Sequence, residues 1–215
     1  EEALLLRAFA ETAPADVLLV LVPRHPQRFN EVAGLIEAAG LAYQRRSMLD
    51  GELGPQTRVL LGDSLGELFA YYAACDVAFV GGSLLPLGGQ NLIEPASVGR
   101  PVLVGPHTFN FEEATRLAIE AGAALRVNDG ADLLAKAMKL LRDAPERARM
   151  GEAGLAFGAR HRGAAAGFDY ERLSHPPATF RQEKHKVDVR MPAARRFIAE
   201  HKLNETFAGE LDGVG

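Results

Sequence analysis

Short apolar runs alternate with longer amphipathic stretches from the start of the chain to about Arg160. One of these runs, Val17 to Val22, is apolar at every position and stops at Pro23. A strand that helices cover on both faces has this continuous pattern, and strands that alternate with helices build parallel sheets. The pattern therefore predicts an α/β fold with a Rossmann-like parallel sheet flanked by helices.

The same periodicity places the individual elements. We expect strands at residues 17–22, 42–46, 58–61, 77–80, 101–104 and 123–127. We expect helices at residues 29–36, 68–75, 112–121, 131–142 and 146–160, and one more that opens at Asn91. Asp63 or Ser64 has the short polar side chain that caps the start of a helix, here the helix over 68–75.

Polar or glycine-rich segments follow four of these strands, at residues 23–25, 62–64, 81–83 and 105–107. In open parallel sheets, ligands gather at the carboxyl ends of the strands. We therefore expect these four segments to line one crevice.

The glycine-rich stretch from Gly81 to Gly105 reads G-G-S-L-L-P-L-G-G-Q-N-L-I-E-P-A-S-V-G-R-P-V-L-V-G. Glycines allow close approach of the backbone, and the free N–H groups of a helix starting at Asn91 favour an anion such as phosphate. Glu94, three residues later, either caps that helix or accepts hydrogen bonds from a sugar diol. A well-capped helix of an ordinary α/β domain has the same spacing, so both interpretations stay open.

Several other side chains have two interpretations. Arg24 either binds a phosphate or carboxylate in bidentate fashion or caps a helix end. The backbone of Leu65 and Gly66 is suited to reading a nucleobase edge, while Glu67 or Glu94 holds ribose hydroxyls; Glu67 alternatively favours the helix dipole.

Composition excludes several classes of function. The net charge is −4 and no Lys/Arg cluster is present, so nucleic acid is not an expected partner. The single cysteine, Cys75, forms no internal disulfide and indicates a reducing, cytosolic compartment. The six histidines lack metal-ligand spacing, and neither a Walker motif nor a G-x-S-x-G elbow occurs, so we expect no metal site, ATPase or hydrolase of that class. No apolar stretch reaches the roughly 18 residues of a membrane span.

The pattern changes after Ala166. Residues 167–190 contain helix-breaking and polar segments and are expected to form a linker. Residues 191–215 are expected to form a short helical tail that starts at Pro192 and has Phe197 and Ile198 on one face. The tail resembles, in part, the peripheral-subunit-binding module of 2-oxo acid dehydrogenase acyltransferases.

Five motifs in order resemble one enzyme family. They are P-R-H-P-Q-R-F at 23–29, L-G-D-S-L-G-E-L at 61–68, D-V-A-F-V-G-G-S-L at 76–84, G-G-Q-N-L-I-E-P at 88–95 and G-P-H-T-F-N-F at 105–111. Residues 1–166 are similar to the carboxyl-terminal half of 3-deoxy-D-manno-octulosonic acid (Kdo) transferases.

The resemblance implies one half of a GT-B fold, in which two Rossmann-like domains face each other across a cleft. It implies transfer of Kdo from CMP-Kdo to the lipid A precursor at the cytoplasmic face of the inner membrane, without a cofactor. The implied CMP contacts are Pro23, Arg24, Leu65, Gly66, Glu67, Asn91, Leu92, Ile93 and Glu94. Further residues expected to line the donor site are His25, Ser64, Gly82, Gly89, Gln90 and His107.

The family's general base is a glutamate of the amino-terminal acceptor domain, which these residues do not include. We therefore expect no catalytic residue here, a sequence that begins partway through a larger protein, and no activity without the acceptor domain. Gln90 stands where many members have histidine, a change that a neutral hydrogen-bonding role tolerates. Two alternatives remain: a GT-B transferase or epimerase that uses a UDP-sugar, and a non-catalytic interaction protein that recruits a partner through its tail.

Overall fold

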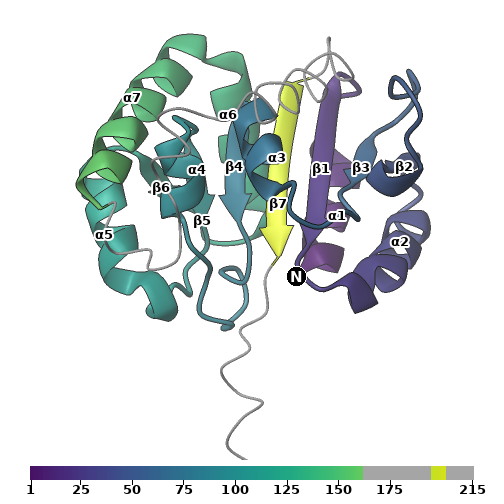
Figure 1. The fold of residues 1–215 in the computed structure, drawn as a ribbon, viewed down its shortest axis with the longest axis horizontal. Coiled ribbons are helices and arrows are strands. Elements are labelled where there is room, and N and C mark those ends of the chain that lie inside the picture. Colours follow the sequence, from purple (N-terminus) through teal and green to yellow (C-terminus); the bar gives the residue numbers. More distant parts are fainter. Residues whose placement is uncertain (162–194, 202–215) are drawn as a thin grey trace, which may run out of the picture.

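Seven parallel strands form one sheet in the computed structural model, which describes residues 1–161 and 195–201 (Figure 1). The strands are β1 (Val17–Pro23), β2 (Tyr43–Arg45), β3 (Val59–Leu61), β4 (Val77–Val80), β5 (Val102–Val104), β6 (Ala124–Arg126) and β7 (Arg195–His201). Their order across the sheet is β2-β3-β1-β7-β4-β5-β6, and every pair is parallel. The predicted α/β class with a parallel sheet is confirmed.

Helices cover both faces of this sheet (Figure 1). They are α1 (Glu2–Thr12), α2 (Phe29–Ala38), α3 (Leu68–Ala74), α4 (Ile93–Ser97), α5 (Glu112–Glu120), α6 (Gly130–Arg142) and α7 (Ala144–Arg160). Three short 3-10 helices, η1 (Pro26–Arg28), η2 (Arg46–Met48) and η3 (Phe109–Phe111), lie in the connections. None of the helices in the described ranges has both the length and the apolar character needed to cross a bilayer.

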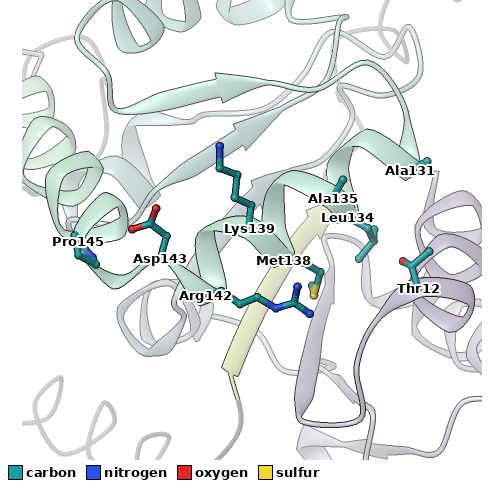
Figure 2. A pocket seen from close by; sticks show the side chains of 9 residues that line it. All are labelled: Thr12, Ala131, Leu134, Ala135, Met138, Lys139, Arg142, Asp143 and Pro145. Atoms are coloured by element: carbon teal, nitrogen blue, oxygen red, sulfur yellow. The ribbon is translucent and has the colours of Figure 1, made fainter.

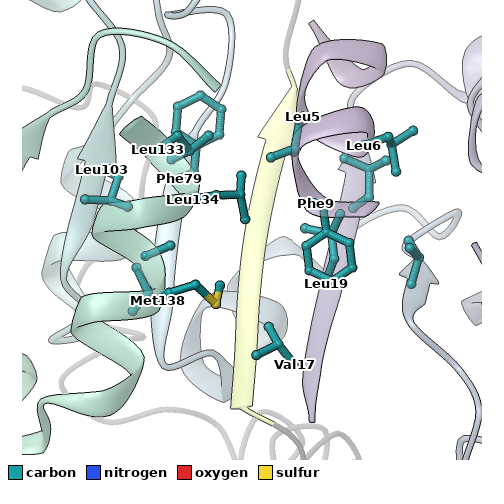
Figure 3. Packing of buried hydrophobic residues seen from close by; sticks show 14 of the residues in the cluster. Leu5, Leu6, Phe9, Val17, Leu19, Phe79, Leu103, Leu133, Leu134 and Met138 are labelled. Atoms are coloured by element: carbon teal, nitrogen blue, oxygen red, sulfur yellow. The ribbon is translucent and has the colours of Figure 1, made fainter. Parts of the chain in front are cut away.

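The continuous apolar run of β1 is explained by its two buried faces. Val17, Leu19 and Leu21 point to one face, where they join side chains of α1 such as Phe9. Figure 3 shows this cluster together with the adjoining residues of α6. Leu18 and Val20 point to the opposite face, where they join the side chains of α3. Every residue of β1 is buried, as a strand between two helical layers must be.

Glycines of α7 meet α4 and the residues just after it. A Cβ atom on Gly151 would lie 2.5 Å from the carbonyl oxygen of Gly99, and one on Gly154 would lie 2.9 Å from that of Ala96. These contacts are with backbone atoms, so side chains at the two positions would push the helices apart. The glycines of α7 therefore allow the short helix α4 to lie directly against it.

Two local expectations about helix starts are wrong. The helix expected at Asn91 begins at Ile93, two residues later. Neither Asp63 nor Ser64 caps α3, which begins at Leu68 after Glu67. Asp63 instead accepts hydrogen bonds from the backbone and hydroxyl of Ser47, because a tertiary partner is available to it.

The tail also differs from its prediction where it is described. Residues 195–201 form strand β7, so a helix over them is wrong. β7 lies between β1 and β4 and pairs in parallel with both. Val17 of β1 lies opposite Arg195, and Val80 of β4 lies opposite Glu200. The predicted linker over 167–190 and the rest of the tail lie outside the described residues.

Candidate functional site

The loops that follow β1, β3, β4 and β5 leave the sheet at one edge because all strands are parallel (lower edge in Figure 1). The chain builds β1 to β3 on one side of β7 and β4 to β6 on the other. A reversal of this kind makes a switch point, where the loops on the two sides diverge and leave a crevice. The four predicted segments therefore lie at the same edge, at the position where sheets of this type bind ligands.

The glycine-rich loop after β4 already holds an anion, the side chain of Glu1. Its carboxylate accepts hydrogen bonds from the backbone N–H groups of Gly82 at 2.5 Å, Ser83 at 3.2 Å and Leu84 at 2.6 Å. Gly82 has a φ of 69°, which turns the loop so that these three donors converge. The Glu1 side chain is only 3% exposed. The loop thus binds negative charge, which in this structure comes from the start of α1 and not from a ligand at Asn91.

Ser83 joins the loops after β4 and β5. Its hydroxyl donates to the carbonyl of Val80 at 2.6 Å and accepts from the Gly105 N–H at 2.8 Å, while its carbonyl accepts from the His107 N–H at 2.9 Å. A Cβ atom on Gly105 would lie 2.2 Å from the Ser83 carbonyl oxygen, which explains the glycine there. The two loops are therefore held in backbone contact.

A second backbone contact extends this group to the loop before α4. The Gly89 N–H donates to the Gly82 carbonyl at 2.7 Å, and the Asn110 N–H donates to the Gly88 carbonyl at 3.0 Å. The structure thus brings together Gly82, Gly89 and His107, three of the residues expected to line the donor site. Gln90, a fourth, follows directly and is buried.

The segment from Asn91 to Glu94 forms the start of α4. The Asn91 side chain accepts a hydrogen bond from the Ile93 N–H at 3.0 Å and donates to the Glu94 carboxylate at 3.3 Å. Leu92 and Ile93 have their side chains in the core, so only their backbone atoms can meet a ligand. Burial, and then the negative charge of Glu94, raises the pKa of the Tyr72 hydroxyl, which stays neutral.

Glu67, on the other side of β7, is held by three side chains. Arg46 donates to one carboxylate oxygen at 2.7 Å, and the Ser64 hydroxyl and the Tyr71 hydroxyl donate to the other, the latter at 3.4 Å. Burial is the main cause that raises the pKa of Tyr71, so its hydroxyl keeps its proton. Arg46 was not among the predicted site residues, since it lies 21 positions from Glu67 in the sequence.

The segment of Leu65 and Gly66 is exposed. The Leu65 side chain is 72% exposed, although it is apolar, and Gly66 beside it has a φ of 78°. Arg24 and His25 are partly buried and follow Pro23 at the end of β1. In the strand order, β1 lies between β3, which leads to Glu67, and β7, with β4 on the far side of β7. This arginine therefore comes from the middle of the predicted crevice.

A pocket of about 690 Å³ lies elsewhere on the molecule (Figure 2). It is lined by the end of α1 at Thr12, by α6 along its length from Ala131 to Arg142, and by the start of α7 at Pro145. Because α1 begins with Glu1 at the carboxyl edge and ends just before β1 starts, its last residues lie at the opposite edge. This pocket is therefore separate from the candidate site.

A family model described as "Glycosyl transferases group 1" matches residues 3–157. The chain is 56% identical to a 3-deoxy-D-manno-octulosonic acid transferase of Bordetella pertussis, over 74% of this chain and 37% of that protein. It is 46% identical to the enzyme of the same name from Haemophilus influenzae, over 69% of this chain and 35% of that protein. The chain thus spans little more than a third of the length of these relatives.

A solved structure also matches this chain. It is the C-terminal CMP-Kdo binding domain of WaaA from Acinetobacter baumannii, with a TM-score of 0.69 and 33% identity. The match covers 73% of this chain and 82% of that domain. At this identity and TM-score, the two proteins share the fold over the matched residues.

Proposed function

We infer that this chain, which belongs to the glycosyl transferases group 1 family, is the donor-binding part of a transferase that moves Kdo from CMP-Kdo to the lipid A precursor. The observation that carries this proposal is the likeness to a solved CMP-Kdo binding domain over most of that domain's length. The joined loops at the switch point support it, because they lie where a nucleotide binds in sheets of this type.

In this proposal, each predicted contact has a chemical task. Arg24 and the backbone amides just before α4, at Asn91 and Leu92, bind the phosphate, and the Leu65–Gly66 backbone meets the cytosine edge. Glu67 and Glu94 accept hydrogen bonds from ribose hydroxyls. Pro23 completes the wall of the nucleotide site, with the Leu92 and Ile93 side chains in the core beneath it. His25, Ser64, Gly82, Gly89, Gln90 and His107 lie around the donor.

The reaction is an inverting transfer. A glutamate of a second domain removes the proton of an acceptor hydroxyl, whose oxygen then attacks the anomeric carbon of Kdo. The bond between that carbon and the phosphate oxygen breaks, and CMP leaves with the electron pair. Arg24 and the amides before α4 stabilise the charge on the departing phosphate, provided that the second domain holds the acceptor in line.

The complete transferase would have a GT-B fold, with the acceptor domain facing the edge where these loops lie. We propose that it works at the cytoplasmic face of the inner membrane, where the lipid A precursor is its acceptor. The present chain would contribute the donor site and bind CMP there.

Calorimetry of the whole chain with CMP tests the proposal. Arg24→Ala and Glu94→Ala should each weaken CMP binding about tenfold or more, the expected effect of losing a hydrogen bond to a charged group. Arg116→Ala is the matched control, because this exposed arginine of α5 pairs with its helix neighbours Glu113 and Glu120, away from the candidate site. Binding of UMP or UDP with no heat from CMP would contradict the proposal and favour a UDP-sugar enzyme.

A further inference from the structure

Arg46 connects β2, the outermost strand of the sheet, to the candidate site. It begins η2, directly after edge strand β2, and its guanidinium donates to Glu67 Oε1 at 2.7 Å. The two side chains are 21% and 23% exposed, so the pair is mostly shielded from water but reachable from it. Ion pairs in such a position are screened less by salt than fully exposed ones.

Neighbouring contacts hold the backbone of this segment in place. The Ser47 N–H and hydroxyl donate to the two oxygens of Asp63 at 2.8 and 2.7 Å, and Arg45 lies 3.6 Å from the same carboxylate. Asp63 belongs to the loop that leads to Glu67. The segment with Arg46 is therefore fixed on that loop by residues on both sides of the arginine.

These contacts fix the direction of the Glu67 carboxylate. Arg46 holds one oxygen, and Ser64 with Tyr71 holds the other. A carboxylate has about four acceptor positions, and these three donors leave room for one more. An acceptor that is already oriented binds a further hydroxyl at a lower entropic cost than a freely rotating side chain does.

We propose that Arg46 is a positioning residue that orients Glu67 to accept a ribose hydroxyl, and that the pair sets a preference for ribonucleotide over 2′-deoxyribonucleotide. The inference rests on the proposed function, because it concerns the same nucleotide. Glu67 touches the sugar, and Arg46 acts only through it.

The test compares CMP with dCMP, which lacks the 2′-hydroxyl, by calorimetry on the whole chain. Wild-type protein should bind CMP more tightly than dCMP. Arg46→Gln should weaken CMP binding about tenfold and change dCMP binding less than about twofold, because only the ribonucleotide uses the oriented oxygen. In a Glu67→Gln background, Arg46→Gln should cause no further loss of CMP affinity, since the effect of Arg46 passes through Glu67.

Arg45→Gln is the matched control. It removes a cation of the same segment that pairs with Asp63 and not with Glu67. The ratio of CMP to dCMP affinity should therefore stay at its wild-type value. Arg46→Lys, which keeps the charge, should recover part of that ratio and also serves if Arg46→Gln fails to fold.

Three outcomes would overturn the inference while leaving the proposed function intact: an unchanged affinity ratio in Arg46→Gln, an equal loss in Arg45→Gln, or a further loss in the Glu67→Gln background. A wild-type chain that does not bind CMP at all would overturn the proposed function, and this inference with it.

Discussion

Replacing Gly151 by alanine tests whether the glycine face of α7 is needed for close packing against α4. Gly151 lies in the interior of α7, where alanine is favoured over glycine by about 1 kcal/mol because it restricts the unfolded chain. Against this gain, the new methyl group would lie 2.5 Å from the Gly99 carbonyl oxygen, much closer than Cβ atoms approach backbone atoms. Overpacking of this kind costs about 1–3 kcal/mol.

Gly34 offers the matched control. It lies within α2, is exposed, and has no atom within 4 Å of the place where a Cβ would stand. Gly34→Ala should therefore show the propensity gain alone, about 1 kcal/mol. The difference between the two variants, about 1–3 kcal/mol in favour of Gly34→Ala, measures the overpacking cost.

Thermal unfolding followed by circular dichroism measures both variants. One kcal/mol shifts Tm by about 2–4 °C in a domain of this size, so Gly34→Ala should raise Tm by about that amount. Gly151→Ala should leave Tm unchanged or lower it, and it should also weaken CMP binding, because α4 carries Glu94. A rise in Tm equal to that of Gly34→Ala, with unchanged CMP affinity, would refute the reasoning.

Three further predictions concern the loops and a helix start. Gly105→Ala, whose methyl group would meet the Ser83 carbonyl, should lower the urea midpoint and weaken CMP binding together, since it separates the loops after β4 and β5. Glu1→Ala leaves three buried loop amides without their acceptor and should cost about 3 kcal/mol in the free energy of unfolding, measured with urea. The hydrogen bond from Lys136 is the main cause that lowers the pKa of Asp132. The ionised Asp132 therefore stabilises the folded protein above the ordinary pKa of an aspartate, and this contribution is lost as pH falls. Asp132→Asn should therefore lose less stability than wild type in urea titrations between pH 5 and about pH 3.

The sheet and the edge that carries the site could be predicted from local patterns. The apolar run from Val17 to Val22 has no polar position because both faces of β1 are covered, and this pattern depends on burial alone. Once the strands are parallel, the loops after them must share an edge. The positions of Arg24, Leu65 and Asn91 at that edge could therefore be predicted from the order of strands and loops in the sequence, without any tertiary contact.

The partners of the site residues could not be predicted in the same way. Glu1 and Gly82 are 81 positions apart in the sequence, and Arg46 and Glu67 are 21 apart. Nothing in the local pattern of either segment specifies such a partner. The same cause explains the wrong cap of α3: Asp63 has the chemistry of a capping residue, but Ser47 supplies it with two better placed donors.

Strand β7 shows how the surroundings decide the structure of an ambiguous segment. The run R-R-F-I-A-E-H is short enough to suit either a helix or a strand, and Pro192 before it favoured a helix. Between β1 and β4, however, a strand satisfies the backbone groups of both neighbours. β7 also keeps these neighbours about 10 Å apart, twice the spacing of adjacent strands. In the proposed site, the long side chain of Arg24 therefore reaches across the end of β7 to share one phosphate with the amides before α4.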